Sequence, residues 1–219
     1  MALVIRPHHR GAFRTLLDEM YRLRHKVFVD RLGWDLYSDG LREMDQFDQG
    51  GSFHVVGLDR EGHVRAASRL TPSHLPNLTC DILGPQMNAP FPRAPHIIEV
   101  SRLCADPDFE TEQRREIMQD LRIAQVELSR KEGWTHNIGV SKDSHIQPWI
   151  RIGAKVEMIG TPFQFPGDQE FSFGWMLSDS EAKPNAIAEF VGATGPAKHL
   201  QDPDADPDLL IRYGDRRVA

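Results

Sequence analysis

The chain has 219 residues, of which 40% are hydrophobic and 26% charged, and its formal net charge is −6. This length supports one domain with a substantial core, and the negative charge argues against a general affinity for nucleic acid or anionic membranes. Two cysteines, Cys80 and Cys104, are too few for a disulfide framework. No apolar run approaches the roughly 20 residues that span a bilayer, and no signal region is evident. We therefore expect a cytoplasmic protein.

The first half of the chain predicts a helix, a long loop and a hairpin. Apolar residues recur at three- and four-residue steps over residues 10–29, which predicts an amphipathic helix. Residues 30–52 contain Gly, Asp and Ser without periodicity and indicate a loop, whose length is typical of functional or mobile segments. Residues 53–58 and 64–70 predict two strands, joined by a turn at residues 59–63.

The second half alternates between strands and helices. Residues 71–96 are rich in Pro and Asn and should be irregular. The elements predicted after them are a strand at 97–104, a helix at 110–132, a strand at 134–140, a helix at 144–152 and strands at 156–159 and 171–177. Gly133 should end the first of these helices, and Pro148 favours a start of the second near Gln147. Such alternation predicts an α/β sheet covered by helices.

The chain changes character from about Ser180 onward. Residues 202–208 read Asp-Pro-Asp-Ala-Asp-Pro-Asp, and an acidic run of this kind is typical of extended, solvated chain. We therefore divide the sequence into a single domain, residues 1–179, and an acidic C-terminal extension, residues 180–219.

Charged and aromatic residues in the first half of the chain are the candidates for a binding site. They are Arg24, Phe28, Trp34, Asp45, Asp48, Arg69, Glu99 and Arg102. Three guanidinium groups, three carboxylates and two aromatic rings suit a small zwitterionic ligand with a delocalised cation, a carboxylate and an amine. The same set is poorly suited to nucleic acid or to a metal.

The residues alone leave several roles open. Phe28 and Trp34 could contact a cationic ligand or be ordinary core aromatics, and the two aspartates could bind an amine or cap a turn. Glu99 could be a general base or a partner in a salt bridge. Glu99 and Arg102 lie three apart on one predicted strand, so they should point to opposite faces unless a bulge reorients one of them.

In this order the eight residues resemble the acyl-homoserine-lactone synthases, and the resemblance runs from about Leu17 to Leu177. It implies a three-layer α/β/α sandwich with a mixed central sheet, similar to the GCN5-related N-acetyltransferases. It also implies that residues 1–52 are a mobile part that closes a pocket for S-adenosylmethionine. The implied reaction acylates this substrate from acyl carrier protein, closes a lactone and releases methylthioadenosine, with no separate cofactor and no metal.

The resemblance also assigns roles to residues. The positions implied to bind S-adenosylmethionine are Arg24, Phe28, Trp34, Asp45, Asp48, Arg69 and Arg102. Glu99 and Arg102 are implied to be catalytic, with Glu99 removing a proton from the substrate amine. The positions implied to form the acyl pocket are Ser101, Leu103, Gly139 and Ser141. Many synthases of 3-oxo-acyl signals carry Thr near position 139, so Gly139 suggests an unsubstituted or differently modified chain.

The segment before the 110–132 helix bears on the acyl donor. Acetyltransferases that use coenzyme A usually bind its pyrophosphate through a glycine-rich loop and a helix N-terminus. Residues 106–113 contain no glycine and four carboxylates, which favours acyl carrier protein over acyl-CoA. Carrier proteins are acidic, so basic residues should meet them. The candidates, each of which could also be an ordinary surface charge, are Arg114, Arg115, Arg122, Arg151 and Lys155.

Two other functions remain possible at this level. The nearer one is an N-acyltransferase of the same fold that acts on a different small amine, and the other is an inactive ligand-binding protein. Ten histidines raise the question of a metal, but no His-Glu-x-x-His or paired Cys/His spacing occurs. We expect His8 and His9 to belong to a solvated terminus.

Overall fold

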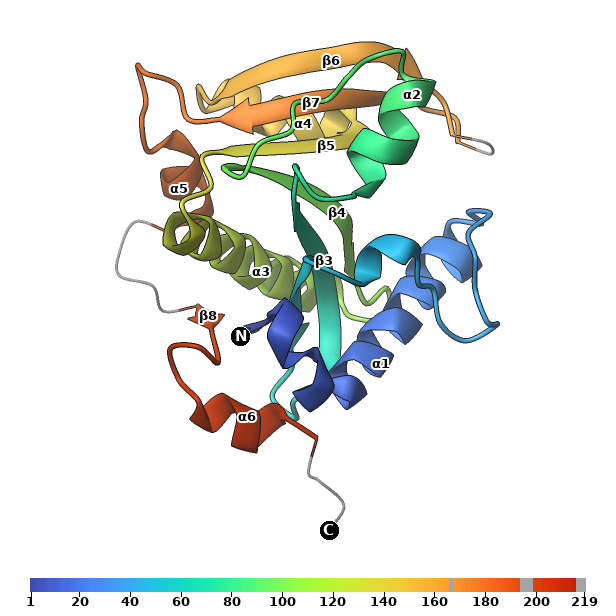
Figure 1. Ribbon diagram of the computed structural model, residues 1–219, viewed down its shortest axis with the longest axis vertical. Helices are drawn as coiled ribbons and strands as arrows, with labels where there is room; N and C mark the ends of the chain where they lie inside the picture. The colour runs from blue at the N-terminus through green and yellow to red at the C-terminus, as the bar shows by residue number, and fades with distance from the viewer. Residues whose placement is uncertain (166–167, 194–198, 216–219) are drawn as a thin grey trace.

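The computed structural model describes residues 1–165, 168–193 and 199–215. Its centre is an eight-stranded mixed sheet with the strand order β6-β7-β5-β4-β3-β2-β1-β8 (Figure 1). The strands are β1 (Ala2–Ile5), β2 (Phe53–Leu58), β3 (Val64–Pro72), β4 (Ile97–Ala105), β5 (His136–Lys142), β6 (Lys155–Phe163), β7 (Ser172–Ser178) and β8 (Leu200–Gln201). Most neighbours are antiparallel, while the β4–β5 and β1–β8 pairs are parallel.

Helices cover both faces of this sheet. The helical elements are η1 (Pro7–Ala12), α1 (Arg14–Arg24), η2 (His25–Arg31), η3 (Gln46–Asp48), η4 (Thr79–Leu83), α2 (Gly84–Gln86), α3 (Thr111–Glu132), α4 (Asp143–Arg151), α5 (Ala186–Val191) and α6 (Asp208–Tyr213). Among the described residues, no helix combines the length and apolar character that crossing a lipid bilayer requires.

Alternation of side chains along the strands produces two separate cores. Val56 and Ala67 pack with the apolar side of α1, whereas Val55 and Leu70 pack with α3. Successive strand residues point to opposite faces, so α1 and α3 lie on opposite sides of the sheet (Figure 1). The predicted α/β/α sandwich with a mixed central sheet is confirmed.

Several boundaries differ from the prediction for local physical reasons. The predicted helix 10–29 is divided into the 3-10 turn η1, the α-helix α1 and the π-helical segment η2. The suggested start of the later helix near Gln147 is wrong, because α4 begins at Asp143 and contains Pro148 in its interior. Pro148 has no backbone N–H to donate to the carbonyl four residues earlier, so α4 lacks one hydrogen bond to its first turn.

The sheet opens between β4 and β5, and this opening positions the site. The two strands pair only from Ile97↔His136 to Glu99↔Ile138. Beyond that point β4 continues beside β3 and β5 continues beside β7, but no further pair joins β4 to β5. Glu99 therefore lies where the sheet separates, with the facing backbone groups of both strands released from the ladder.

A β-bulge follows immediately in β4. The pairing register with β3 shifts between Ala67↔Cys104 and Arg69↔Ser101, so β4 contains one extra residue there. Arg102 occupies this position with φ 54°, a left-handed conformation that is unusual for any residue except glycine. The bulge predicted as one alternative for the Glu99–Arg102 spacing is thus present.

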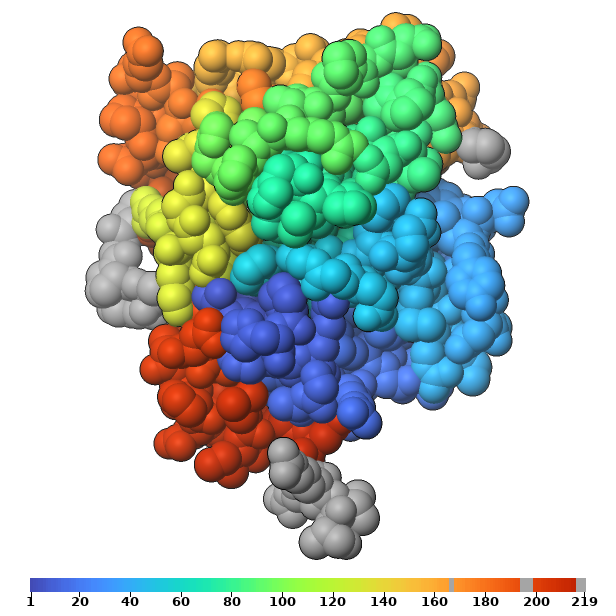
Figure 2. Space-filling view, in the orientation of Figure 1, coloured from blue at the N-terminus to red at the C-terminus, as the bar shows by residue number. Residues whose placement is uncertain are grey.

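The C-terminal extension is folded over its described residues, so the prediction of an extended, solvated tail is wrong. Strand β8 pairs with β1 in parallel, and Leu209 of α6 is buried in the α1 core. Figure 2 shows the tail, in red, against the N-terminal residues, in blue. Residues 194–198 and 216–219 of the extension lie outside the described residues.

Buried ion pairs explain why an acidic tail can fold back on the domain. The Asp202 carboxylate accepts hydrogen bonds from Arg6 at 2.7 and 2.9 Å and from Lys131 at 2.6 Å. Burial alone would raise the pKa of Asp202, but these cationic donors outweigh it and lower the pKa from 3.8 to about 2. The acidic composition of the tail is therefore compensated by cations far away in the sequence.

Replacing Asp202 with Asn should destabilise the protein by about 3 kcal/mol near neutral pH, because Arg6 would lose a buried ionic partner. The folded pKa is depressed, so the stabilisation is complete above about pH 4 and is lost as the pH falls toward 2. Denaturant unfolding of both proteins between pH 2 and 7 measures the difference. The exposed Asp206→Asn change is the control, and an equal loss in both variants would contradict the assignment.

Candidate active site

A buried network of ion pairs ties the 30–52 segment to the helical layer. The Arg24 guanidinium donates to both carboxylate oxygens of Asp48, at 2.6 and 3.0 Å, and to Glu43 at 2.7 Å. All three side chains are about 1% exposed. Burial disfavours the Asp48 carboxylate, but the charges of Arg24 and Arg69 outweigh that cost and hold the pKa of Asp48 below its ordinary value.

Arg69, on β3, joins this network to the strand that carries Glu99. Its guanidinium contacts Asp45, donates to Asp48 at 3.1 Å and donates to the Ser101 hydroxyl at 3.1 Å. Burial would lower the pKa of Arg69, but the surrounding carboxylates raise it above its usual value. One terminal nitrogen, Nη2, is buried without a hydrogen-bond partner among the described residues. A buried guanidinium with an unused donor can accommodate an additional acceptor group.

Arg102 forms the outer edge of the same network. The bulge directs its side chain toward the 30–52 segment, where it donates to Glu43 at 3.1 Å and to Asp45 at 3.0 Å. The Asp45 side chain is 14% exposed, whereas those of Asp48 and Glu43 are fully enclosed. The network therefore has an inner part, Arg24, Asp48 and Glu43, and an outer part nearer the solvent, Asp45 and Arg102.

The two aspartates cap a helical turn, as one of the two alternatives for these residues predicted. Asp45 is the N-cap of η3 and accepts a hydrogen bond from the Phe47 backbone N–H at 2.9 Å. Asp48 accepts in return from the Asp45 backbone N–H at 2.8 Å. This reciprocal capping fixes the turn, and the turn fixes the positions at which both carboxylates meet the arginines.

The predicted aromatic residues stack with one another. Phe28 and Trp34 lie with ring centroids 5.1 Å apart and an interplanar angle of 16°, and Phe165 covers the other side of Trp34 at 5.6 Å and 18°. The Arg102 guanidinium lies 5.7 Å from the Phe28 centroid. Both faces of the indole are thus covered by protein, so a ligand can stack on Trp34 only if Phe165 moves.

Glu99 is fully buried at the point where β4 and β5 separate. Its carboxylate accepts hydrogen bonds from the hydroxyls of Thr79 and Ser101, both at 3.1 Å. Neither partner is a cation, and the hydrogen bonds link Glu99 to Arg69 only through the Ser101 hydroxyl. Burial therefore dominates and raises the pKa of Glu99 above its ordinary value of 4.5, despite the opposing charge of Arg69. A carboxylate with a raised pKa is suited to accept a proton near neutral pH.

The four residues implied to form the acyl pocket do not converge. Ser101 lies on the face of Glu99, where it belongs to the charged network. Gly139 and Ser141 follow Ile138, the partner of Glu99, by one and three residues and so point to the opposite face. There Trp175 covers both, since a Cβ at Gly139 would lie 2.7 Å from the indole and the indole N–H donates to Ser141 at 2.9 Å. The Leu103 side chain is 39% exposed.

The five cations suggested for carrier docking divide by their partners. Arg115 pairs with Glu112 at 3.1 Å, and Lys155 pairs with Glu157 at 2.6 Å. Arg114, Arg122 and Arg151 have no acidic partner within the part of the chain that the structure describes. Arg122 stands out among these, because the atoms packed around it lower the pKa of its guanidinium and no carboxylate compensates.

Three residues of the site were not predicted from the sequence. Glu43 bridges Arg24 and Arg102, yet it lies in a segment without periodicity. Its position two residues before Asp45 could have indicated a shared face of extended chain. Thr79 and Phe165 reach the site from the irregular 71–96 region and from the segment after β6, and neither had a detectable signal.

Comparisons with known proteins agree with this geometry. The autoinducer synthase family matches the chain over residues 9–185. An acyl-homoserine-lactone synthase of Ralstonia nicotianae is 29% identical over 207 residues, which cover 87% of this chain and 97% of that protein.

Solved structures support the same fold. BjaI, a CoA-dependent acyl-homoserine-lactone synthase solved with S-adenosylmethionine and isopentyl-CoA, has a TM-score of 0.76 at 19% identity, covering 97% of this chain and 98% of that one. A putative N-acetyltransferase from Lactobacillus plantarum has a TM-score of 0.50 at 16% identity, covering 81% of this chain and 97% of that one. The chain therefore belongs to the autoinducer synthase family and is an acyl-transferring enzyme of the acyl-homoserine-lactone synthase type.

Proposed function

We propose that this enzyme makes an N-acyl-L-homoserine lactone from S-adenosyl-L-methionine and an acyl thioester, with release of methylthioadenosine. The observation that carries the proposal is the position of Glu99, a buried carboxylate with a raised pKa at the opening between β4 and β5. This position supports a role for Glu99 as a base, because unpaired strand backbone lies beside it and a charged network that suits a zwitterion lies next to it.

In the first step Glu99 takes a proton from the substrate α-amine, directly or through a water molecule. The free amine attacks the thioester carbonyl, the C–S bond breaks and the thiol leaves. Backbone N–H groups released where β4 and β5 separate can stabilise the negative charge on the carbonyl oxygen. Ser101 and Thr79 hold the Glu99 carboxylate by hydrogen bonds of 3.1 Å, which fixes its direction without adding a cation that would weaken it as a base.

In the second step the substrate carboxylate attacks the carbon next to the sulfonium, and methylthioadenosine leaves as the C–S bond breaks. The sulfonium is already a good leaving group, so the enzyme has mainly to position the two reacting groups. The unused Nη2 donor of Arg69 is our candidate to orient the carboxylate. Asp45 and Arg102, the outer part of the network, are our candidates for direct contact with the amino acid portion.

The inner residues have a different proposed role. Arg24, Asp48 and Glu43 saturate one another and are enclosed, so we propose that they order the 30–52 segment rather than contact the ligand. Phe28 and Trp34 would then shape the side of the pocket for the adenosyl or sulfonium group, with displacement of Phe165. Closure over the pocket is proposed for residues 30–52 alone, because β1 is a buried strand of the sheet and α1 packs into its core.

We further propose acyl carrier protein as the preferred donor, with acyl-CoA as the alternative. The segment before α3 has no glycine-rich loop, which argues against a built pyrophosphate site. Two of its carboxylates are neutralised internally, because Asp106 pairs with Lys26 and Arg65 and Asp108 pairs with Lys26. The uncompensated Arg122 and the exposed Arg151 are cations available to a phosphate group or an acidic carrier surface.

Product analysis tests the reaction itself. Purified enzyme should convert S-adenosylmethionine and an acyl thioester into an N-acyl lactone and methylthioadenosine, both identified by mass spectrometry. A simple amide without methylthioadenosine would instead indicate an N-acyltransferase for a different small amine. Binding of S-adenosylmethionine without turnover of any acyl thioester would indicate an inactive ligand-binding protein.

Replacing Glu99 with Gln should lower kcat by about 10²- to 10⁴-fold, the usual contribution of a positioned general base. In the native enzyme kcat/KM should rise with pH through a limb above pH 4.5, because the pKa of Glu99 is raised, and this limb should be absent in the variant. Isothermal titration with S-adenosylmethionine and circular dichroism control for binding and folding. Near-full turnover by a folded Glu99→Gln protein would contradict the role of base.

Replacing Arg69 with Lys should weaken S-adenosylmethionine binding at least tenfold, because an ammonium group cannot retain the forked contacts of the guanidinium. Isothermal titration measures the dissociation constant. Arg22→Lys is the matched control, since Arg22 forms an exposed pair with Asp18 on the same protein. Unchanged affinity in both variants would restrict Arg69 to a structural role.

Reversing the charge of Arg122 or Arg151 to Glu should raise the KM for acyl carrier protein several-fold and leave kcat nearly unchanged. The control is Arg60→Glu, which makes the same charge change at an exposed position in the β2–β3 turn. Parallel assays with acyl-CoA identify the donor. A higher kcat/KM for acyl-CoA than for the carrier protein would show that the donor preference is wrong.

A further inference from the structure

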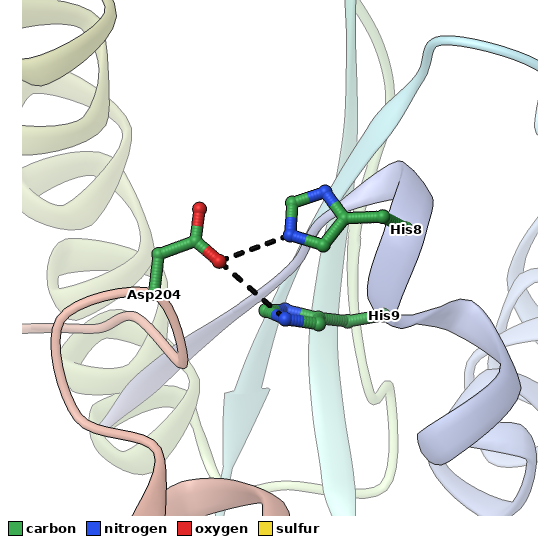
Figure 3. A group of neighbouring side chains, drawn as sticks. All are labelled: His8, His9 and Asp204. Atoms are coloured by element: carbon green, nitrogen blue, oxygen red, sulfur yellow. Dashed lines mark hydrogen bonds and ion pairs between the residues drawn. The ribbon is translucent and has the colours of Figure 1, made fainter.

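Two adjacent histidines and an aspartate from the other end of the chain converge outside the charged network. His8 and His9 belong to η1, which follows β1, and Asp204 belongs to the tail between β8 and α6 (Figure 3). Their Nε2 atoms lie 3.0 and 3.4 Å from the same carboxylate oxygen, Oδ1 of Asp204. The expectation that both histidines are solvated is therefore wrong for His9, whose side chain is only 15% exposed.

The two N···O separations are close to the spacing of ligand atoms around a tetrahedral metal ion. Zinc binds imidazole nitrogen and carboxylate oxygen at about 2.0–2.2 Å, so neighbouring ligand atoms around it are separated by about 3.3 Å. The observed N···O separations are 3.0 and 3.4 Å, and all three ligand atoms lie within 4.8 Å of one another. Little movement would be needed to admit an ion of this size.

The residues behind Asp204 hold it in place through its other oxygen. Arg6 Nε lies 3.0 Å from Oδ2 of Asp204, which leaves Oδ1 directed at the histidines. The Arg6 charge is itself compensated by Asp202 at 2.7 Å and Glu132 at 2.7 Å. Such outer contacts orient a ligand, as they do in known metal sites, and here they limit the repulsion between the guanidinium and a bound cation.

The donor types favour a transition metal over calcium or magnesium, which prefer oxygen ligands alone. The imidazoles bind such an ion in their neutral form. The His8 side chain is 60% exposed and leaves a route for the ion and a position for water as a fourth ligand.

We propose that His8, His9 and Asp204 bind a divalent transition metal, with Zn²⁺ as the best fit, and that this ion fastens the C-terminal tail to the N-terminal strand. Strand β8 already pairs with β1 through two residues only, Leu200 and Gln201. The ion would lock that short pairing by joining the residues that follow each strand. Because the ligands are brought together only by the folded tail, binding stabilises the folded state.

The test uses the full chain, stripped with a chelator and titrated with Zn²⁺ alone. Isothermal titration should give one ion per chain, and saturating Zn²⁺ should raise Tm by a few degrees, reversibly on adding chelator. Co²⁺ in place of Zn²⁺ should give the intense visible absorption of a tetrahedral site. His9→Ala and Asp204→Asn should each weaken Zn²⁺ binding at least tenfold.

The control is His63→Ala, because His63 faces a single carboxylate, Glu19 at 3.3 Å, and lacks a third ligand. It should bind Zn²⁺ like the native protein. Asp204→Asn also removes a contact of Arg6, so the quantity compared is the Zn²⁺-dependent shift in Tm within each variant. Native affinity in the double variant His8→Ala/His9→Ala, or no one-to-one binding by the native chain, would overturn the proposal, and neither outcome bears on the acyl transfer.

Discussion

The structure depends on the burial of two guanidinium groups, Arg24 and Arg69, around the carboxylate of Asp48. A buried charge without a partner costs several kcal/mol, so both arginines need carboxylate partners, and Asp48 is the partner that they share. Asp48 lies in a segment with little apolar content of its own. Ion pairs, rather than the burial of apolar surface, therefore hold this polar segment against the sheet.

This constraint determines what the site presents to a ligand. Since Arg24 and Asp48 satisfy each other, the remaining capacity for polar contact lies in the outer part of the network and in the free Nη2 of Arg69. Glu99 is linked to the Arg69 guanidinium through the Ser101 hydroxyl rather than by a direct ion pair, and its complete burial raises its pKa despite the opposing charge of Arg69. A direct pair with Arg69 would have lowered that pKa and removed the capacity to accept a proton near neutrality.

Sequence patterns predicted the elements that have a local apolar periodicity. They failed where contacts between residues far apart in the sequence determine the structure. The α3 helix and the β2, β3 and β4 strands follow their apolar periods closely, and the eight charged and aromatic positions were recognised as a set. The tail was misread because composition says nothing about Arg6 and Lys131, which neutralise Asp202 across long sequence separations. Strand β1 was missed because four residues, all buried, are too few to display a period. Glu43 was not predicted because the segment that carries it has no periodicity.

Substitutions in the inner and outer parts of the network should have different effects on stability and on ligand binding. The two parts also share residues, so these effects are coupled. Glu43 pairs with both Arg24 and Arg102, and Arg69 contacts both aspartates, so the inner and outer parts are coupled through common atoms. Removing an inner residue leaves a buried charge unpaired and perturbs the fold as well as the ligand contacts, whereas removing an outer residue exposes its partner to water. Effects on stability and on binding are consequently non-additive across these pairs. A change in ligand affinity identifies a ligand contact directly at positions such as Arg102, where loss of the side chain leaves the inner ion pairs intact, and at Arg69 it does so when the stability of the variant is unchanged.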